Sequence, residues 1–187
     1  PGDTILVHAA AGGMGLILCQ WAKALGAKVV GTVSTHEKAE VARAAGCHYP
    51  VVRSEQSFVD VVREVTDGEG CAVVYEAIGK DTLQHSLDSL RPMGVCAAYG
   101  HVSGPPDPVD IIKDLGRRGS LFITRPAIMH YVAKRADLEW TARDLFKAIG
   151  DGLLEANINY EYALKDAVKA HEAIESGKTL GATVLIP

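Results

Sequence analysis

The chain has 187 residues, of which 48% are apolar and 22% are charged, with a formal net charge of −4 at pH 7. This length can bury a real core, as one domain or one domain with a small appendage, and the mild negative charge gives no general attraction to nucleic acid or anionic membranes. No apolar run approaches the ~20 residues that cross a bilayer, and no basic, apolar signal peptide opens the chain.

The first 124 residues alternate strand-like and helix-like segments with short turns, as a parallel α/β sheet requires. The strand-like runs are 4–9, 28–33, 49–52, 71–79, 94–100 and 120–126. The helical patterns between them are about 14–25, 37–45, 57–66 and 81–90. This rhythm predicts a Rossmann-type, doubly wound, six-stranded parallel sheet in the order 3-2-1-4-5-6, with a ligand crevice at the carboxyl ends of strands one and four.

The rhythm changes after Pro126, where a C-terminal extension of helices and a strand begins. A long helix is expected at about 136–150. Four residues at helical spacing predict a second helix: Ala167, Ala170, His171 and Ile174. The last predicted strand, near 182–186, has no place in the first sheet and is expected to pair with something else, for which an absent part of a longer protein is one candidate.

A run in which all residues but one are small joins the first predicted strand to the first helix: Ala10, Ala11, Gly12, Gly13, Met14 and Gly15. Set against the G-x-G-x-x-G pattern, Gly12 would let the backbone approach a pyrophosphate, and Gly15 would let the helix pack closely on the strand. Exposed N–H groups and the helix dipole would complement the phosphates. Because the loop lies inside a βαβ unit, we predict a dinucleotide site in preference to a packing turn without a ligand.

The end of the second strand indicates which dinucleotide is bound. An NAD site usually has an Asp or Glu there for the ribose 2′-hydroxyl, whereas this chain has Ser34, followed by Lys38 one helical turn later. A hydroxyl and a cation accept a 2′-phosphate, and Arg53 after the third strand could add a second cation. Glu37 leaves an alternative open: it could be an NAD-type acidic residue displaced by a few positions, or simply an acid in the first turn of the second helix, where the dipole favours it. We favour NADPH.

Five blocks of sequence follow one another in a recognisable order: HAAAGGMGLILCQWAKALGAKVVGTVST, VVYEAIGKDT, GVCAAYGHVSG, GSLFITRP and YALKDAVKAHEAIESGKTLGATVLIP. Together they closely resemble the quinone oxidoreductase (zeta-crystallin-like) branch of the medium-chain dehydrogenase/reductases. The resemblance implies a GroES-like catalytic domain ahead of this chain, which starts without Met and looks like a piece of a longer protein. It also implies a division into a dinucleotide-binding domain, 1–124, and a segment, 125–187, that would pack with that catalytic domain.

The resemblance further implies that the nicotinamide lies in the cleft between the two domains. The residues implied to line its nicotinamide half follow strands five and six: Tyr99, Gly100, His101, Thr124, Arg125 and Pro126. Ala77 and Gly79, after strand four, would pass beside the middle of the cofactor. His101 could equally be a plain loop histidine.

The implied reaction is zinc-independent hydride transfer from NADPH to a quinone or another electron-poor acceptor, and no catalytic side chain can be identified in this piece. A zinc-free 2-enoyl thioester reductase is a second reading. A third is a non-catalytic NADPH-binding protein with a redox-sensing or structural role.

The remaining expectations concern cysteines and assembly. Cys19, Cys47, Cys71 and Cys96 form no C-x-x-C pair and are expected to be reduced and buried, as in a cytoplasmic protein. The apolar sixth strand is expected to form the edge of the sheet and to join two subunits in a homodimer.

Overall fold

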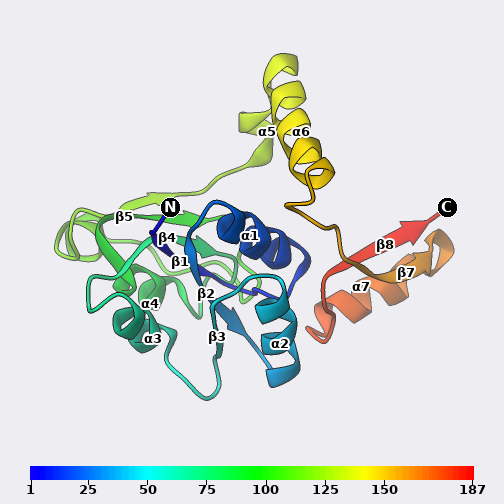
Figure 1. Cartoon of the computed structure of the whole chain (residues 1–187). Helices are drawn as coiled ribbons and strands as arrows, with labels where there is room; N and C mark the ends of the chain where they lie inside the picture. The colour runs from blue at the N-terminus through cyan, green and yellow to red at the C-terminus, as the bar shows by residue number, and fades with distance from the viewer.

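The computed structural model describes all 187 residues, Pro1 to Pro187. Its main sheet has six parallel strands in the order β3-β2-β1-β4-β5-β6 (Figure 1), which confirms the predicted topology. The strands are β1 (Thr4–Val7), β2 (Lys28–Val33), β3 (Tyr49–Val52), β4 (Cys71–Glu76), β5 (Leu90–Ala98) and β6 (Phe122–Thr124). The strand order reverses between β1 and β4, so a crevice opens at the carboxyl ends of these two strands.

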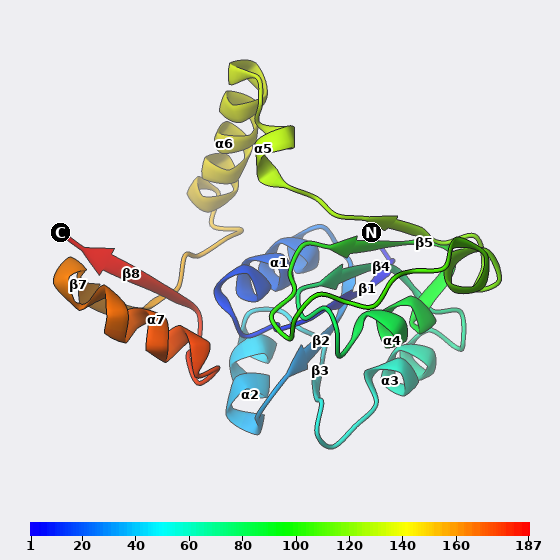
Figure 2. The same cartoon turned by 180° about the vertical axis from the view of Figure 1, so that it is seen from behind.

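Helices cover both faces of the sheet, as two opposite views show (Figures 1 and 2). They are α1 (Gly13–Ala24), α2 (His36–Ala44), α3 (Phe58–Val65) and α4 (Leu83–Asp88). Successive strand side chains point to opposite faces: Ile5 and Val7 of β1 pack in the core beneath α1 and α2, and Leu6 packs in the core beneath α3 and α4. The four cysteines are buried free thiols, as expected.

The first helix packs on the sheet through Gly15, Leu16 and Cys19, which are buried. Met14, in its first turn, is 56% exposed. A β-carbon on Gly15 would lie 2.7 Å from the Ala10 Cα, too close for a real contact. The missing side chain therefore sets how closely α1 approaches the end of β1.

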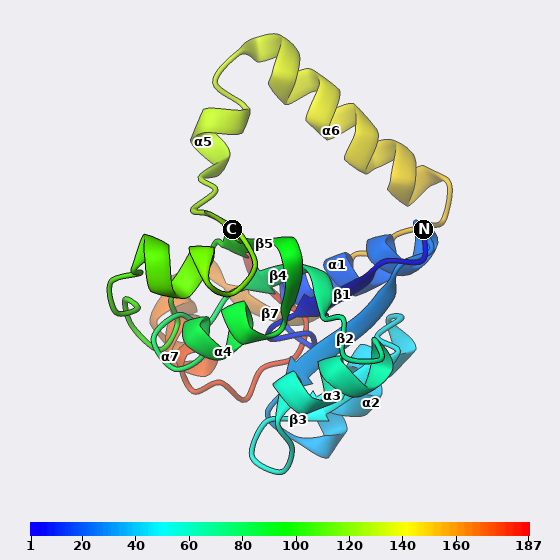
Figure 3. The ribbon, with the colours of Figure 1, turned by 90° about the vertical axis from the view of Figure 1, so that its left-hand side faces the viewer.

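Two elements on either side of β6 were not predicted. A π-helix, η1 (Ile111–Gly116), precedes β6, and a short helix, α5 (Ile128–Tyr131), follows it. The predicted long helix is α6 (Arg135–Gly150), and together with α5 it stands clear of the main sheet (Figures 1 and 3). No helix is both long enough and apolar enough to span a bilayer.

The C-terminal strand has its partner within the chain. β7 (Ile158–Ala163), which the sequence analysis missed, pairs in parallel with β8 (Ala182–Ile186) in a separate two-stranded sheet. A short 3-10 turn, η2 (Leu164–Asp166), and a helix, α7 (Ala167–Glu175), connect the two strands. This small unit lies beside α1 and α2, near the carboxyl ends of the central strands (Figure 1).

Candidate functional site

The turn after β1 is shaped for close approach to the backbone. Ala9 has a φ of +51°, a left-handed conformation that an L-residue adopts at a cost of about 1 kcal/mol. Gly12 is the N-cap of α1, in extended conformation, and no side chain caps the helix. The first turn of α1 thus presents N–H groups and the positive end of its dipole without an internal partner.

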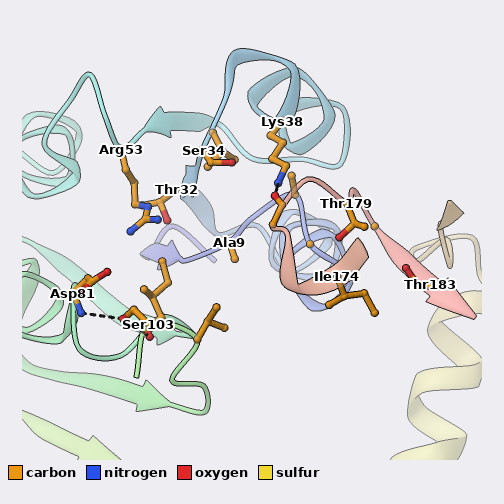
Figure 4. A pocket seen from close by; sticks show the side chains of 18 residues that line it. Ala9, Thr32, Ser34, Lys38, Arg53, Asp81, Ser103, Ile174, Thr179 and Thr183 are labelled. Carbon is orange, nitrogen blue, oxygen red and sulfur yellow. Dashed lines mark hydrogen bonds between the residues drawn. The ribbon is translucent and has the colours of Figure 1, made fainter. Parts of the chain in front are cut away.

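A cleft of about 510 Å³ lies directly in front of this turn (Figure 4). This volume is in the range of small-molecule sites. Six of the predicted cofactor residues line it: Ala11, Gly12, Gly13, Ser34, Lys38 and Arg53. The structure therefore brings the glycine turn and the predicted phosphate-binding side chains into one cavity.

The end of β2 carries no acid facing the cleft. Glu37 lies in the first turn of α2, whose N-cap is Thr35, and does not line the cavity. Its position is the one that the helix dipole favours for an acid. Of the two cations, Lys38 donates from Nζ to the backbone carbonyl of Gly177 at 2.5 Å, and Arg53 reaches the cavity from the end of β3.

One wall of the cleft comes from the C-terminal unit, which sequence reasoning did not place there. Its lining residues are Ile174, Gly177, Thr179, Gly181 and Thr183. The N–H of Gly181 donates to the carbonyl of Ala11 at 3.0 Å, so the segment before β8 is attached to the glycine turn itself. Because Ala11 and Gly181 are 170 positions apart, no local sequence pattern predicts this contact.

The opposite wall comes from the turns after β4 and β5 (Figure 4). It includes Ile78, Asp81 and Ser103, none of which was predicted. The Asp81 N–H donates to the Ser103 Oγ at 3.1 Å, which ties the two turns together. Thr32, near the end of β2, also lines the cavity and was missed.

Several predicted residues shape the loops around the cleft without lining it. Met14 is exposed, and Ala77 is buried. A β-carbon on Gly79 would lie 2.6 Å from the Gly104 carbonyl oxygen, and one on Gly100 would lie 2.9 Å from the Ala77 Cα. These two glycines allow the turns after β4 and β5 to pack backbone against backbone.

The predicted nicotinamide-side residues gather at a separate place, at the ends of β5 and β6. Arg125 donates to the carbonyl of Tyr99 and lies 3.4 Å from Nδ1 of His101. Thr124, Arg125 and Pro126 line a hollow of about 260 Å³. Burial raises the pKa of Tyr99 to about 12, so its hydroxyl stays protonated at neutral pH.

The side chains of this chain offer no metal centre: none of its 187 residues belongs to a group of three or more His, Cys, Asp or Glu that could hold an ion.

Comparison with known proteins identifies a family and relatives to which this chain is similar. The zinc-binding dehydrogenase family matches residues 13–140. A 2-haloacrylate reductase from Burkholderia sp. is 54% identical over 187 residues, which is all of this chain and 56% of that protein. Quinone oxidoreductase 1 from Escherichia coli (strain K12) is 42% identical, over all of this chain and 58% of that protein.

Solved structures agree. The crystal structure of Escherichia coli quinone oxidoreductase complexed with NADPH superposes with a TM-score of 0.94 at 42% identity, over the whole of this chain and 58% of that one. The crystal structure of 2-haloacrylate reductase gives a TM-score of 0.93 at 53% identity, with the same coverage. The chain thus spans little more than half the length of these relatives, and its resemblance to the medium-chain dehydrogenase/reductases is confirmed.

Proposed function

Because this chain belongs to the zinc-binding dehydrogenase family, we propose that its cleft binds NADPH and that the whole protein reduces an electron-poor acceptor. The observation that carries the cofactor proposal is the lining of the cleft. An uncapped helix N-terminus lies at one end, and a hydroxyl with two cations, Ser34, Lys38 and Arg53, lies at the other. These groups suit a pyrophosphate and a 2′-phosphate respectively.

The chain's own residues bind and orient the cofactor. Gly12 and Gly13 leave room for the pyrophosphate against the backbone, and the C-terminal unit closes one side of the cleft at Gly181. Tyr99, His101 and Arg125, held together at the ends of β5 and β6, would face the nicotinamide half. Bound NADPH supplies the hydride.

Two acceptor classes follow from the relatives. A quinone is the first, by similarity to quinone oxidoreductase 1. A 2-haloacrylate, an alkene made electron-poor by its carboxylate and halogen, is the second, favoured by the 54% identity to a 2-haloacrylate reductase. In this proposal residues 1–124 bind the dinucleotide, residues 125–187 pack with a preceding catalytic domain, the residues here hold no zinc, and the protein works in the cytoplasm.

Removing either cation tests the cofactor proposal. We expect Lys38→Ala and Arg53→Ala each to weaken NADPH binding by about 10-fold or more and to leave NADH binding within about two-fold, because a hydrogen bond to a charged group contributes about 1.5–3 kcal/mol. Calorimetric titration measures both constants. Arg63→Ala, which removes an exposed cation of α3 outside the cleft, should change neither. Equal losses for NADPH and NADH would contradict a 2′-phosphate site.

The β6 edge is the proposed dimer contact. β6 pairs only with β5, and Phe122 on it is 60% exposed. A lysine on an edge strand opposes edge-to-edge pairing, so Phe122→Lys should convert a dimer at tens of micromolar into a monomer in sedimentation experiments. Ile111→Lys, on exposed η1, should leave the dimer intact. A monomeric unmodified chain would refute this contact.

A further inference from the structure

A cluster of polar side chains is buried beneath the cleft, where an apolar core would be expected. His8, Thr32, Glu76 and Ser86 are each 0% exposed, and Thr82 is 2% exposed. They come from the ends of β1, β2 and β4, from the N-cap of α4 and from α4 itself. Burying a carboxylate and an imidazole costs several kcal/mol unless hydrogen bonds satisfy both groups.

One oxygen of Glu76 holds the turn that follows β4. Its Oε1 accepts hydrogen bonds from the backbone N–H of Ile78 at 2.7 Å, from the N–H of Gly79 at 3.1 Å and from the Thr82 hydroxyl at 2.9 Å. The turn 77–82 therefore winds around a single carboxylate oxygen. It is also the turn that presents Ile78 and Asp81 to the cleft.

The other oxygen of Glu76 is reached by a chain of hydrogen bonds from the far side of the crevice. Because a carboxylate only accepts, the Ser86 hydroxyl donates to Oε2, at 2.5 Å. The Ser86 Oγ, 2.9 Å from His8 Nε2, must then accept the His8 Nε2–H. His8 Nδ1 is left to accept from the Thr32 hydroxyl, at 2.9 Å, and Thr32 lines the cleft.

The protonation states agree with this direction of donation. Burial, only partly offset by the neighbouring Glu76, lowers the pKa of His8 to about 4, so the ring is neutral and carries one N–H at pH 7. Burial works against ionisation of Glu76 as well, but the adjacent His8 and the donated hydrogen bonds keep the pKa of Glu76 below its ordinary value. Every polar atom of this chain of contacts therefore has its partner.

We propose that Glu76 and His8 are positioning residues for the nucleotide cleft. Glu76 fixes the turn 77–82, whose Ile78 and Asp81 line the cleft together with Arg53, a cation proposed for the 2′-phosphate. His8 fixes the orientation of the Glu76 carboxylate through Ser86. This assignment rests on the proposed NADPH site. It explains why a charged side chain stands at the buried end of β4, where an aliphatic residue would pack without a desolvation cost.

The test compares Glu76→Gln with Val62→Ala, which opens a cavity in the core beneath the same sheet but touches neither the turn nor the cleft. We expect Glu76→Gln to weaken the binding of both NADPH and adenosine 2′,5′-bisphosphate by about 10-fold, measured at a temperature where both variants are folded. We also expect the amide hydrogens of Ile78 and Gly79 to exchange at least about 10-fold faster. Val62→Ala should lower the melting temperature without either effect.

Thr82→Val, which removes one donor to the carboxylate and leaves its charge, should act in the same direction with about a three-fold change. It replaces Glu76→Gln if that variant does not fold. Unchanged nucleotide affinity and unchanged exchange at Ile78 and Gly79 would overturn the positioning role and leave Glu76 a structural residue. If the unmodified chain binds neither nucleotide, the NADPH proposal fails and the positioning role fails with it. Faster amide exchange at Ile78 and Gly79 in Glu76→Gln would then show only that Glu76 stabilises the turn 77–82.

Discussion

Replacing Gly15 by alanine is expected to lower the free energy of unfolding by at least about 3 kcal/mol. The added β-carbon would lie 2.7 Å from the Ala10 Cα and closer still to the Ala9 carbonyl oxygen, so α1 must move away from β1. Forced overpacking costs about 1–3 kcal/mol where side chains can adjust, and here the obstacle is backbone. Urea denaturation, followed by the fluorescence of Trp21 and Trp140 and by circular dichroism, measures the loss.

Gly12→Ala is the matched control, because its added carbon meets only the Ala9 carbonyl oxygen, at 3.3 Å, and its φ of −81° suits an L-residue. We expect this variant to lose less than about 1 kcal/mol of stability. Its methyl group stands where the pyrophosphate would approach, so NADPH binding should weaken by about 10-fold or more. Full stability in Gly15→Ala, or unchanged NADPH affinity in Gly12→Ala, would refute the roles given to the two glycines.

Lowering the pH from 7 to 4 is expected to remove about 3 kcal/mol of stability through His8 alone. Burial lowers the pKa of His8 from 6.5 to about 4 in the folded state. Above pH 6.5 the ring is neutral in both the folded and unfolded states, and His8 contributes no pH dependence. Between pH 6.5 and 4 only the unfolded chain takes up the proton, so stability falls across this window and levels off below it.

The variant His8→Asn isolates this effect. Asparagine keeps a donor and an acceptor but does not titrate, so the stability difference between the two proteins should shrink by about 3 kcal/mol from pH 7 to pH 4. The other histidines titrate in both proteins and cancel in the difference. Urea denaturation at a series of pH values measures it. A difference that stays constant with pH would show that His8 is not a buried neutral ring.

The sheet could be predicted because each strand and helix carries its own local pattern. The runs of β2 and β3 were predicted with the bounds observed, and Gly12 and Gly15 marked the turn between β1 and α1. Strand β6 is shorter than predicted, since pairing with β5 covers only Phe122–Thr124. The alternation of strands and helices then allowed few topologies other than the one found.

The C-terminal wall of the cleft could not be predicted, because it depends on contacts distant in sequence. β7 did carry a strand signal that was missed, because Ile158, Tyr160 and Tyr162 alternate with polar residues. The hydrogen bond from Gly181 to Ala11, in contrast, joins residues near opposite ends of the chain and leaves no local pattern. His8 and Glu76 did leave a signal, as polar residues inside the apolar runs VHAA and VYEA. The contact between these two residues through Ser86 could not be predicted, because it exists only once the fold brings the ends of β1 and β4 together.

The measurement that most directly tests the account is calorimetric titration of the unmodified chain with NADPH and, separately, with NADH. The cleft formed by the glycine turn, Ser34, Lys38 and Arg53 predicts one NADPH per chain, bound at least about 10-fold more tightly than NADH. Equal affinities would contradict the 2′-phosphate site, and no binding of either nucleotide would contradict the dinucleotide cleft itself.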